Sequence, residues 1–208
     1  MARKKTNLIM LVLLVISLVC SCTLYKTPRV EDAMYKNFEY EFTFRVPNGW
    51  SVQQDFPKAL ESDLAGHFSK DFCVMLIHPQ NNGMIIFQAD KSDEDIFSLG
   101  YNQEAFKERL TARLQAREQE IAEAGELENF TWDIGSLSVK QGYGPTLIYQ
   151  ESASNKNGEQ YVLLEYLTQC RNKCTCRITV TLVTKASDLQ GNFAVYDKVT
   201  DSLKKVYM

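Results

Sequence analysis

The sequence is poor in the residues and motifs on which most enzymes depend. It has only two histidines, His67 and His78, in 208 residues, and neither belongs to a His-Glu-x-x-His zinc pattern. It also has no Gly-x-Ser-x-Gly nucleophile elbow and no glycine-rich phosphate loop. His78 precedes a turn proline, which indicates a histidine at a strand end. The sequence therefore predicts no catalytic residues, no cofactor and no metal site, so we expect a protein that is not an enzyme.

The sequence also lacks an apolar run long enough to span a membrane as a permanent helix. The longest run, residues 8 to 19, follows the basic residues Arg3, Lys4 and Lys5 and is shorter than the ~20 residues that a spanning helix needs. A basic start, a short apolar stretch and a small residue before a cleavage point are typical of an export signal. We therefore expect residues 1–21 to be removed and the remaining chain to work outside the cytoplasm.

The end of this signal, Val19-Cys20-Ser21-Cys22, resembles the lipobox of bacterial lipoproteins. In that family the signal is cut before the cysteine, whose thiol carries diacylglycerol and whose new amine is acylated. Cleavage between Ser21 and Cys22 fits better than cleavage before Cys20, because Cys20 follows the bulky Val19. Two or three acyl chains, at ~0.8 kcal/mol per buried CH₂, hold a protein firmly to a membrane. An ordinary secretory signal and an uncleaved anchor are the alternatives.

Positive charge is scarce once the signal is gone. The signal holds three cations and no acid, which leaves 20 Lys plus Arg against 26 Asp plus Glu and a net charge of −6. Such a surface argues against nucleic acid and against polybasic binding to anionic lipid. We expect residues 22–36 to be a flexible tether and residues 37–208 to form one domain. Thr23 follows Cys22, where an aspartate would favour retention in the inner membrane of enterobacteria, so the outer membrane is favoured. We expect the domain to face the periplasm.

Apolar and polar residues alternate from Phe38 to Val46, which predicts a strand with one apolar face. A turn at 47–50 follows, and Trp50 is expected to fold back over the core. Residues 72–78 and 84–88 predict a hairpin whose Asn-Gly connection uses a glycine that tolerates positive φ. Further strands are predicted in the second half of the chain, at 129–132, 137–140, 146–152, 161–169 and 175–184. A closing helix is expected over residues 192–207.

Residues 103–124 predict the one long helix, and three arginines lie on or beside its apolar stripe. The stripe consists of Phe106, Leu110, Leu114 and Ile121. In one interpretation the stems of Arg109, Arg113 and Arg117 pack while their guanidinium groups reach water or Glu120. In the other, these arginines form a basic ridge that binds an acidic partner.

Four cysteines remain beside Cys22, and an even number of thiols in an oxidising compartment suggests disulfide bonds. Cys170 and Cys174 flank three residues, so a hairpin can bring them together. Cys176 can reach Cys73 if the strand 72–78 is its neighbour. Buried reduced cysteines and a four-thiolate metal site are the alternatives, although the spacing differs from that of two Cys-x₂-Cys knuckles.

Strands and helices in this order predict an α+β fold, a largely antiparallel sheet with a long central helix and a C-terminal helix packed on it. The run from Phe42 to Trp50 and the ending from Tyr196 to Val206 resemble the PsbP-like superfamily, which includes bacterial envelope lipoproteins of the DcrB type. The resemblance covers residues 36 to 207 and implies a PsbP-like sandwich.

That resemblance also implies a binding or assembly role in the cell envelope, with an envelope protein or small ligand as the partner. A thiol-redox or metal-handling protein that uses the hairpin cysteines is the first alternative. An unrecognised hydrolase is the second, because the sequence has many carboxylates but does not show which of them meet.

Overall fold

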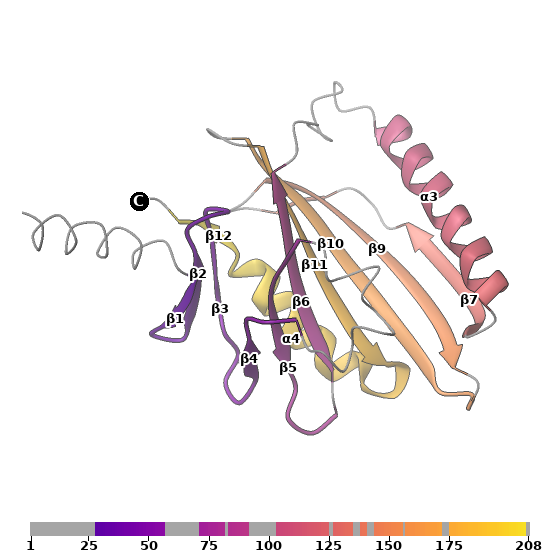
Figure 1. Cartoon of the computed structure of the whole chain (residues 1–208), viewed down its shortest axis with the longest axis horizontal. Coiled ribbons are helices and arrows are strands. Elements are labelled where there is room, and N and C mark those ends of the chain that lie inside the picture. Colours follow the sequence, from indigo (N-terminus) through magenta and orange to yellow (C-terminus); the bar gives the residue numbers. More distant parts are fainter. Residues whose placement is uncertain are drawn as a thin grey trace, which may run out of the picture.

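The computed structural model describes residues 28–56, 71–81, 83–91, 103–124, 127–134, 138–140, 144–155, 157–171 and 175–206. In this part of the chain, two antiparallel sheets are accompanied by two α-helices and a short 3-10 helix (Figure 1). The predicted α+β class with largely antiparallel strands is confirmed.

The smaller sheet has four strands in the order β1-β2-β3-β12. They are β1 (Arg29–Glu31), β2 (Met34–Asn37), β3 (Phe42–Arg45) and β12 (Lys204–Lys205). The expectation of a tether as far as residue 36 is therefore wrong in its second half, since β1 and β2 pair as a hairpin. The first described strand begins at Arg29, seven residues after Cys22.

The larger sheet has eight strands, in the order β4-β5-β6-β11-β10-β9-β7 with β8 paired to β9. Their bounds are β4 (Ser51–Gln53), β5 (Phe72–Ile77), β6 (Met84–Lys91), β7 (Leu127–Ile134), β8 (Ser138–Lys140), β9 (Gly144–Asn155), β10 (Gln160–Arg171) and β11 (Thr175–Lys185). All of the strands that the sequence predicts from residue 72 onward are present, and most are longer than predicted.

The strand predicted over residues 38 to 46 is shorter in the structure. A turn occupies residues 38–41, because the Asn37 side chain caps it: its Oδ1 accepts the backbone N–H groups of Glu39 and Tyr40 at 3.0 and 3.1 Å. Glu41 then adopts a φ of 54°, which lies in the left-handed region and not in the extended region of a regular strand. The alternating segment therefore begins as a turn, and only its second half forms a strand, β3.

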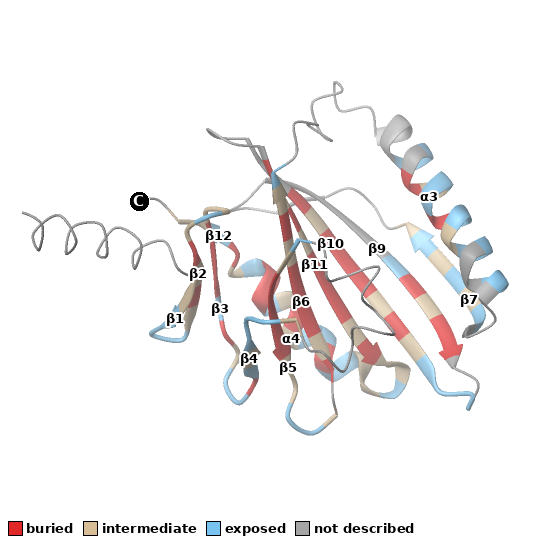
Figure 2. Cartoon of the chain, in the orientation of Figure 1, coloured by how far each residue is buried: buried red, intermediate tan, exposed pale blue. Residues whose placement is uncertain are grey.

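The main core lies between one face of the larger sheet and a second layer that the smaller sheet and α4 (Leu189–Asp201) form together. Phe44 stacks on Phe87 with ring centroids 3.9 Å apart, which joins the two sheets. The alternating residues Ile178, Val180 and Leu182 of β11 are all buried here, as the sequence predicts. In the larger sheet, burial is concentrated on the strands β5, β6, β11 and β10 (Figure 2).

The closing helix ends earlier than predicted. After the 3-10 helix η2 (Ala186–Asp188), α4 stops at Asp201, and the chain continues into β12 instead of remaining helical to residue 207. Ser202 closes the helix, because its Oγ donates to the Val199 carbonyl oxygen at 2.7 Å and accepts the Arg45 backbone N–H at 2.9 Å. The last described strand thereby pairs with β3.

The long helix α3 (Gln103–Ala124) matches its predicted bounds but is not central. It lies over β7, at the end of the larger sheet opposite to the smaller sheet (Figure 1). Leu110 and Leu114 pack there against Trp132 and Ile134. Side chains of the other stripe residues, Phe106 and Ile121, lie outside the described part.

The hairpin between β5 and β6 is held against α4 by a close approach of the backbone. A Cβ atom on Gly83 would lie 2.4 Å from the Asn192 Nδ2, so only glycine fits. Asn192 is buried, and its Nδ2 donates to Thr184 Oγ1 at 2.7 Å. Gly83 is not one of the described glycines with positive φ, which are Gly49 and Gly158. The predicted glycine is therefore required for a different reason, the space beside Asn192.

Candidate functional site

The predicted lipidation site, Cys22, and the cleavage position, Ser21, lie outside the described residues. Of the described helices, none combines the length and the apolar character needed to cross a membrane. The longest of them, α3, has 22 residues and is rich in charged side chains.

Of the three arginines predicted as a ridge on α3, Arg113 and Arg117 lie in different surroundings. Arg113 is exposed, whereas Arg117 is directed to the sheet, and the side chain of Arg109 lies outside the described part, as does that of Glu120. Arg117 Nε lies 3.1 Å from Glu151 Oε2 of β9. The Arg117 side chain is 22% exposed and that of Glu151 only 3%. Arg117 therefore joins α3 to the sheet and does not present its charge to a partner.

The Arg117–Glu151 contact is an ion pair of poor hydrogen-bond geometry. The two atoms are close, yet Glu151 Oε2 has no hydrogen bond of acceptable angle to any described group. Removing one partner of a buried ion pair leaves an uncompensated charge, which usually costs 3–5 kcal/mol. A second contact, from Trp132 Nε1 to Glu118 Oε2 at 3.3 Å, also fastens the helix. The described side chains of α3 also include a small apolar patch around Leu110 and Leu114.

Two other buried polar side chains lie near Glu151 on the same face of the sheet. Glu165 of β10 and Thr181 of β11 are directly opposite each other in the ladder, so their Cβ atoms are about 5 Å apart. Glu165 also faces Tyr149, two residues from Glu151 in β9. Thr181 Oγ1 has no hydrogen bond to a described residue. This polar cluster was not apparent in the sequence, because it depends on the register of three strands.

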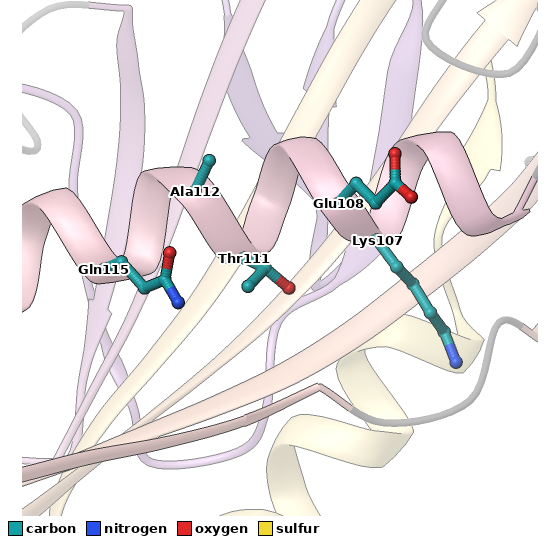
Figure 3. Close-up of a pocket in the computed structure, with 5 residues that line it drawn as sticks. All are labelled: Lys107, Glu108, Thr111, Ala112 and Gln115. Carbon is teal, nitrogen blue, oxygen red and sulfur yellow. The ribbon is translucent and has the colours of Figure 1, made fainter.

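A shallow hollow of about 330 Å³ lies on the flank of α3 (Figure 3). The residues that line it in the described part are Lys107, Glu108, Thr111, Ala112 and Gln115. None of them is buried. These side chains spread around the helix and do not converge on one point (Figure 3). The hollow therefore lacks the set of convergent polar groups that fixes a small ligand.

Cys73 lies in the main core with its thiol protonated. Burial raises its pKa to about 12, although the Ala89 backbone N–H opposes this shift. Its Sγ donates to the Asp71 carbonyl oxygen at 3.7 Å, and it is not in a disulfide bond. The thiolate is the nucleophile and the metal ligand of cysteine chemistry. Cys73 is therefore poorly suited to either task.

The strand order does not meet the condition for a Cys73–Cys176 bond. β6 lies between β5 and β11, so two strand spacings, about 9.5 Å, separate the backbones. A disulfide requires Cα atoms 4.4–6.8 Å apart. Cys176 is instead the direct ladder partner of Cys170. Cys174 lies outside the described residues, and so does the side chain of Cys170.

His78 stabilises the turn between β5 and β6. Its Nδ1 accepts the backbone N–H groups of Gln80 and Asn81 at 3.2 and 3.4 Å, and its ring packs edge-on against Trp50. The sequence predicts a strand-end histidine here, and the structure confirms that position. His67 lies outside the described residues. Among the residues described, no three His, Cys, Asp or Glu side chains are arranged to hold a metal ion.

The outer face of the smaller sheet carries most of its charge as cations. Ladder partners place Arg29, Lys36, Thr43 and Lys204 in one row across all four strands. The core residue Tyr35 alternates with these positions and is fully buried, so the row faces away from the core. Arg45, paired with Met34, adds a further cation to this face. We refer to Arg29, Lys36, Arg45 and Lys204 as the cationic face.

Glu31 is the acidic residue that shares the strand positions of the cationic face. Its Oε2 lies 2.8 Å from Lys36 Nζ and 3.6 Å from the Arg29 guanidinium. Hydrogen bonding and charge from Lys36, with a contribution from Arg29, lower the pKa of this carboxyl. Four cations against one carboxylate at these strand positions give this face a net positive charge, whereas the whole chain has a net charge of −3. The sequence did not reveal it, because the four cations lie in four separate strands.

Comparisons with known proteins give structural likenesses only. No family model matches the chain, and no curated protein does. Cyanobacterial PsbP from Synechocystis sp. PCC 6803 is 17% identical, with a TM-score of 0.48 over 87% of this chain and 97% of its own. LpqN of Mycobacterium tuberculosis, described as involved in cell envelope biogenesis, is 11% identical, with a TM-score of 0.46 over 80% of this chain and 83% of its own.

The Saccharomyces cerevisiae Ran-binding protein Mog1p is also similar, at 12% identity and a TM-score of 0.43, over 86% of this chain and 97% of its own. At these identities and scores, none of the three likenesses indicates what this chain binds.

Proposed function

We propose that this protein is a lipid-anchored protein of the bacterial cell envelope with a binding or assembly role and no catalytic activity. The observation that carries the proposal is the run from Met1 to Cys22, in which a basic start and an apolar stretch end at a lipobox-like Val19-Cys20-Ser21-Cys22. Acyl chains on Cys22 hold the domain to the membrane, the outer membrane being favoured by Thr23. The domain faces the periplasm.

The ordered domain supports this arrangement. Its first described strand begins at Arg29, seven residues after Cys22. Seven residues span at most about 25 Å when fully extended, so the acyl chains keep the smaller sheet near the bilayer.

The binding role is supported by the way in which the described titratable side chains are used. Glu151 pairs with Arg117, and Asp90 Oδ2 accepts from Arg177 Nε at 3.0 Å, so these carboxylates have partners within the fold. His78 Nδ1 is occupied by backbone N–H groups. A general base needs a free lone pair within hydrogen-bond reach of a substrate proton. These three groups are engaged within the fold, so a binding role is assigned to the exposed surface and not to them.

Labelling of cells with radioactive palmitate tests the anchor. Wild-type protein should acquire the label, and Cys22→Ser should abolish it and leave an uncleaved or soluble precursor. Cys20→Ser is the matched control and should be labelled and processed normally. Label on the Cys22→Ser protein would contradict the assignment.

A further inference from the structure

We infer that the cationic face of the smaller sheet rests against the anionic phospholipid headgroups of the membrane that holds the acyl chains. The inference rests on the proposed lipid anchor and adds to it the surface with which the domain contacts the membrane. Its partner is a lipid surface of negative charge. The cations that make the contact are Arg29, Lys36, Arg45 and Lys204.

The geometry of the sheet matches a flat, charged partner. Arg29, Lys36 and Lys204 lie in one row across four strands, which spans about 14 Å at 4.8 Å per strand. Arg45 and Lys204 are exposed. A two-dimensional array of cations on a sheet can meet many headgroups at once, whereas a pocket would meet only one.

The position of the anchor selects this face over other charged surfaces. β1, the first strand of the described domain, is the edge strand of this sheet, and it follows Cys22 by seven residues. Seven residues span at most about 25 Å. Electrostatic attraction to a membrane extends about one Debye length, ~8 Å at physiological ionic strength. The anchor therefore keeps the cationic face close to the range in which its charge acts.

Other cations of the domain lie far from the anchor. Lys107 and Arg113 are exposed on α3, at the opposite end of the molecule from the smaller sheet (Figure 1). These two residues provide a matched control, because changing them removes the same charge from a surface that should not touch the bilayer.

The test compares the labelling of single lysines on two kinds of vesicle. Processed protein purified from cell envelopes is placed in vesicles of phosphatidylcholine, or of phosphatidylcholine with phosphatidylglycerol. Lysines are then methylated reductively and quantified by mass spectrometry. Lys36 and Lys204 should react several-fold more slowly on the anionic vesicles, and high salt should restore their rates. Lys107 should react equally on both. If Lys36 and Lys204 each react at the same rate on both kinds of vesicle, the inference is overturned. An acidic protein would then be the better candidate for the partner of the cationic face.

A second experiment, vesicle sedimentation, does not require acylation of the protein. The mature chain with Cys22→Ser is mixed at low ionic strength with phosphatidylglycerol vesicles, and its partition coefficient is measured by sedimentation. Each Lys or Arg near an anionic surface contributes about 1 kcal/mol. Arg45→Gln with Lys204→Gln should therefore lower partitioning roughly thirtyfold, whereas Lys107→Gln with Arg113→Gln should leave it unchanged. Equal losses in the two double variants would contradict a defined face.

Failure of the lipid anchor would be recognised separately. If the processed protein carries no acyl chains, it is purified without a membrane and mixed with the same vesicles before labelling. The comparison between Lys36, Lys204 and Lys107 remains the same measurement. An unacylated protein that still shows slowed labelling on anionic vesicles would support the surface and contradict the anchor.

Discussion

At the scale of single residues, close backbone approach and burial decide the behaviour of the most constrained positions. Gly83 adjoins Asn192, whose amide is committed to Thr184. Cys73 and Tyr40 have pKa values raised to about 12, in each case chiefly because burial disfavours the charged form. Both kinds of constraint lead to measurable effects on stability.

Gly83→Ala should destabilise the fold. The new methyl group would lie 2.4 Å from Asn192 Nδ2, so either the hairpin or α4 must shift. Overpacking of this kind costs about 1–3 kcal/mol, which lowers the Tm by roughly 2–4 °C per kcal/mol in a domain of this size. Gly191→Ala is the control, because nothing lies within 4 Å of the added Cβ and the residue is helical. Alanine favours the helix there, so its Tm should stay the same or rise. Equal losses in the two variants would contradict the close approach.

Stability should fall as the pH rises above about 9. Unfolded cysteine ionises near its ordinary pKa of 9.0, whereas the folded Cys73 thiol remains protonated until about pH 12. Ionisation therefore stabilises only the unfolded state in this window, by up to about 1.4 kcal/mol per pH unit and group. Cys73→Ala lacks this thiol, so its free energy of unfolding should decrease less between pH 8 and pH 11 than that of the wild type. Parallel urea-unfolding curves for both proteins at both pH values make the comparison, and identical decreases would contradict the raised pKa.

At the scale of elements, polar contacts secure parts that have little apolar contact of their own. The main example is α3, which rests on β7 through Leu110 and Leu114 and is joined to β9 by the Arg117–Glu151 pair. In the hairpin of β10 and β11, a different feature matters: the strand register determines which cysteines can meet.

Arg117→Ala should cost about 3–5 kcal/mol, because Glu151 would remain buried without its cation. Arg113→Ala, on the exposed side of the same helix, should change stability by less than about 0.5 kcal/mol. Replacing both partners, with Arg117→Met and Glu151→Leu, should recover most of the loss. Denaturant unfolding of the three variants measures this. Similar effects of the Arg113 and Arg117 variants would instead support a solvent-facing ridge.

Cys170 should bond with Cys176 in protein taken from an oxidising envelope. The two are ladder partners, and directly opposed strand residues have Cβ atoms about 4.5–5.5 Å apart, near the ~3.8 Å that the bond needs. Cys176 is a buried, reduced thiol in the structure. Thiol–disulfide exchange with an oxidised envelope dithiol protein would form the bond and leave that protein reduced. Non-reducing peptide mapping distinguishes this link from Cys170–Cys174, the pairing suggested by sequence spacing. Alkylation of both Cys170 and Cys176 in the untreated protein would contradict the bond.

At the scale of the whole molecule, local periodicity was sufficient for most elements and insufficient for their arrangement. The bounds of α3, the hairpin of β5 and β6, and the buried face of β11 followed from the sequence, because each depends on side-chain alternation within one segment. The turn at residues 38–41 was missed because the capping side chain of Asn37 overrides a regular alternation. The end of α4 was missed because β12 is stabilised by pairing with a distant strand, β3.

The candidate sites depended on long-range register even more strongly. The cationic face draws its residues from positions 29, 36, 45 and 204, and the polar cluster from three strands and a helix. A pattern read along the chain cannot bring such positions together. In contrast, the predicted anchoring signal lies within twenty-two consecutive residues, so the sequence alone is sufficient to predict it.

The account depends above all on the acylation of Cys22, and mass spectrometry of the N-terminal peptide of the processed protein tests it most directly. The peptide should begin at Cys22, with a diacylglyceryl group on the thiol and an acyl chain on the amine. A peptide that begins at another residue, or an unmodified Cys22, would contradict the lipid anchor.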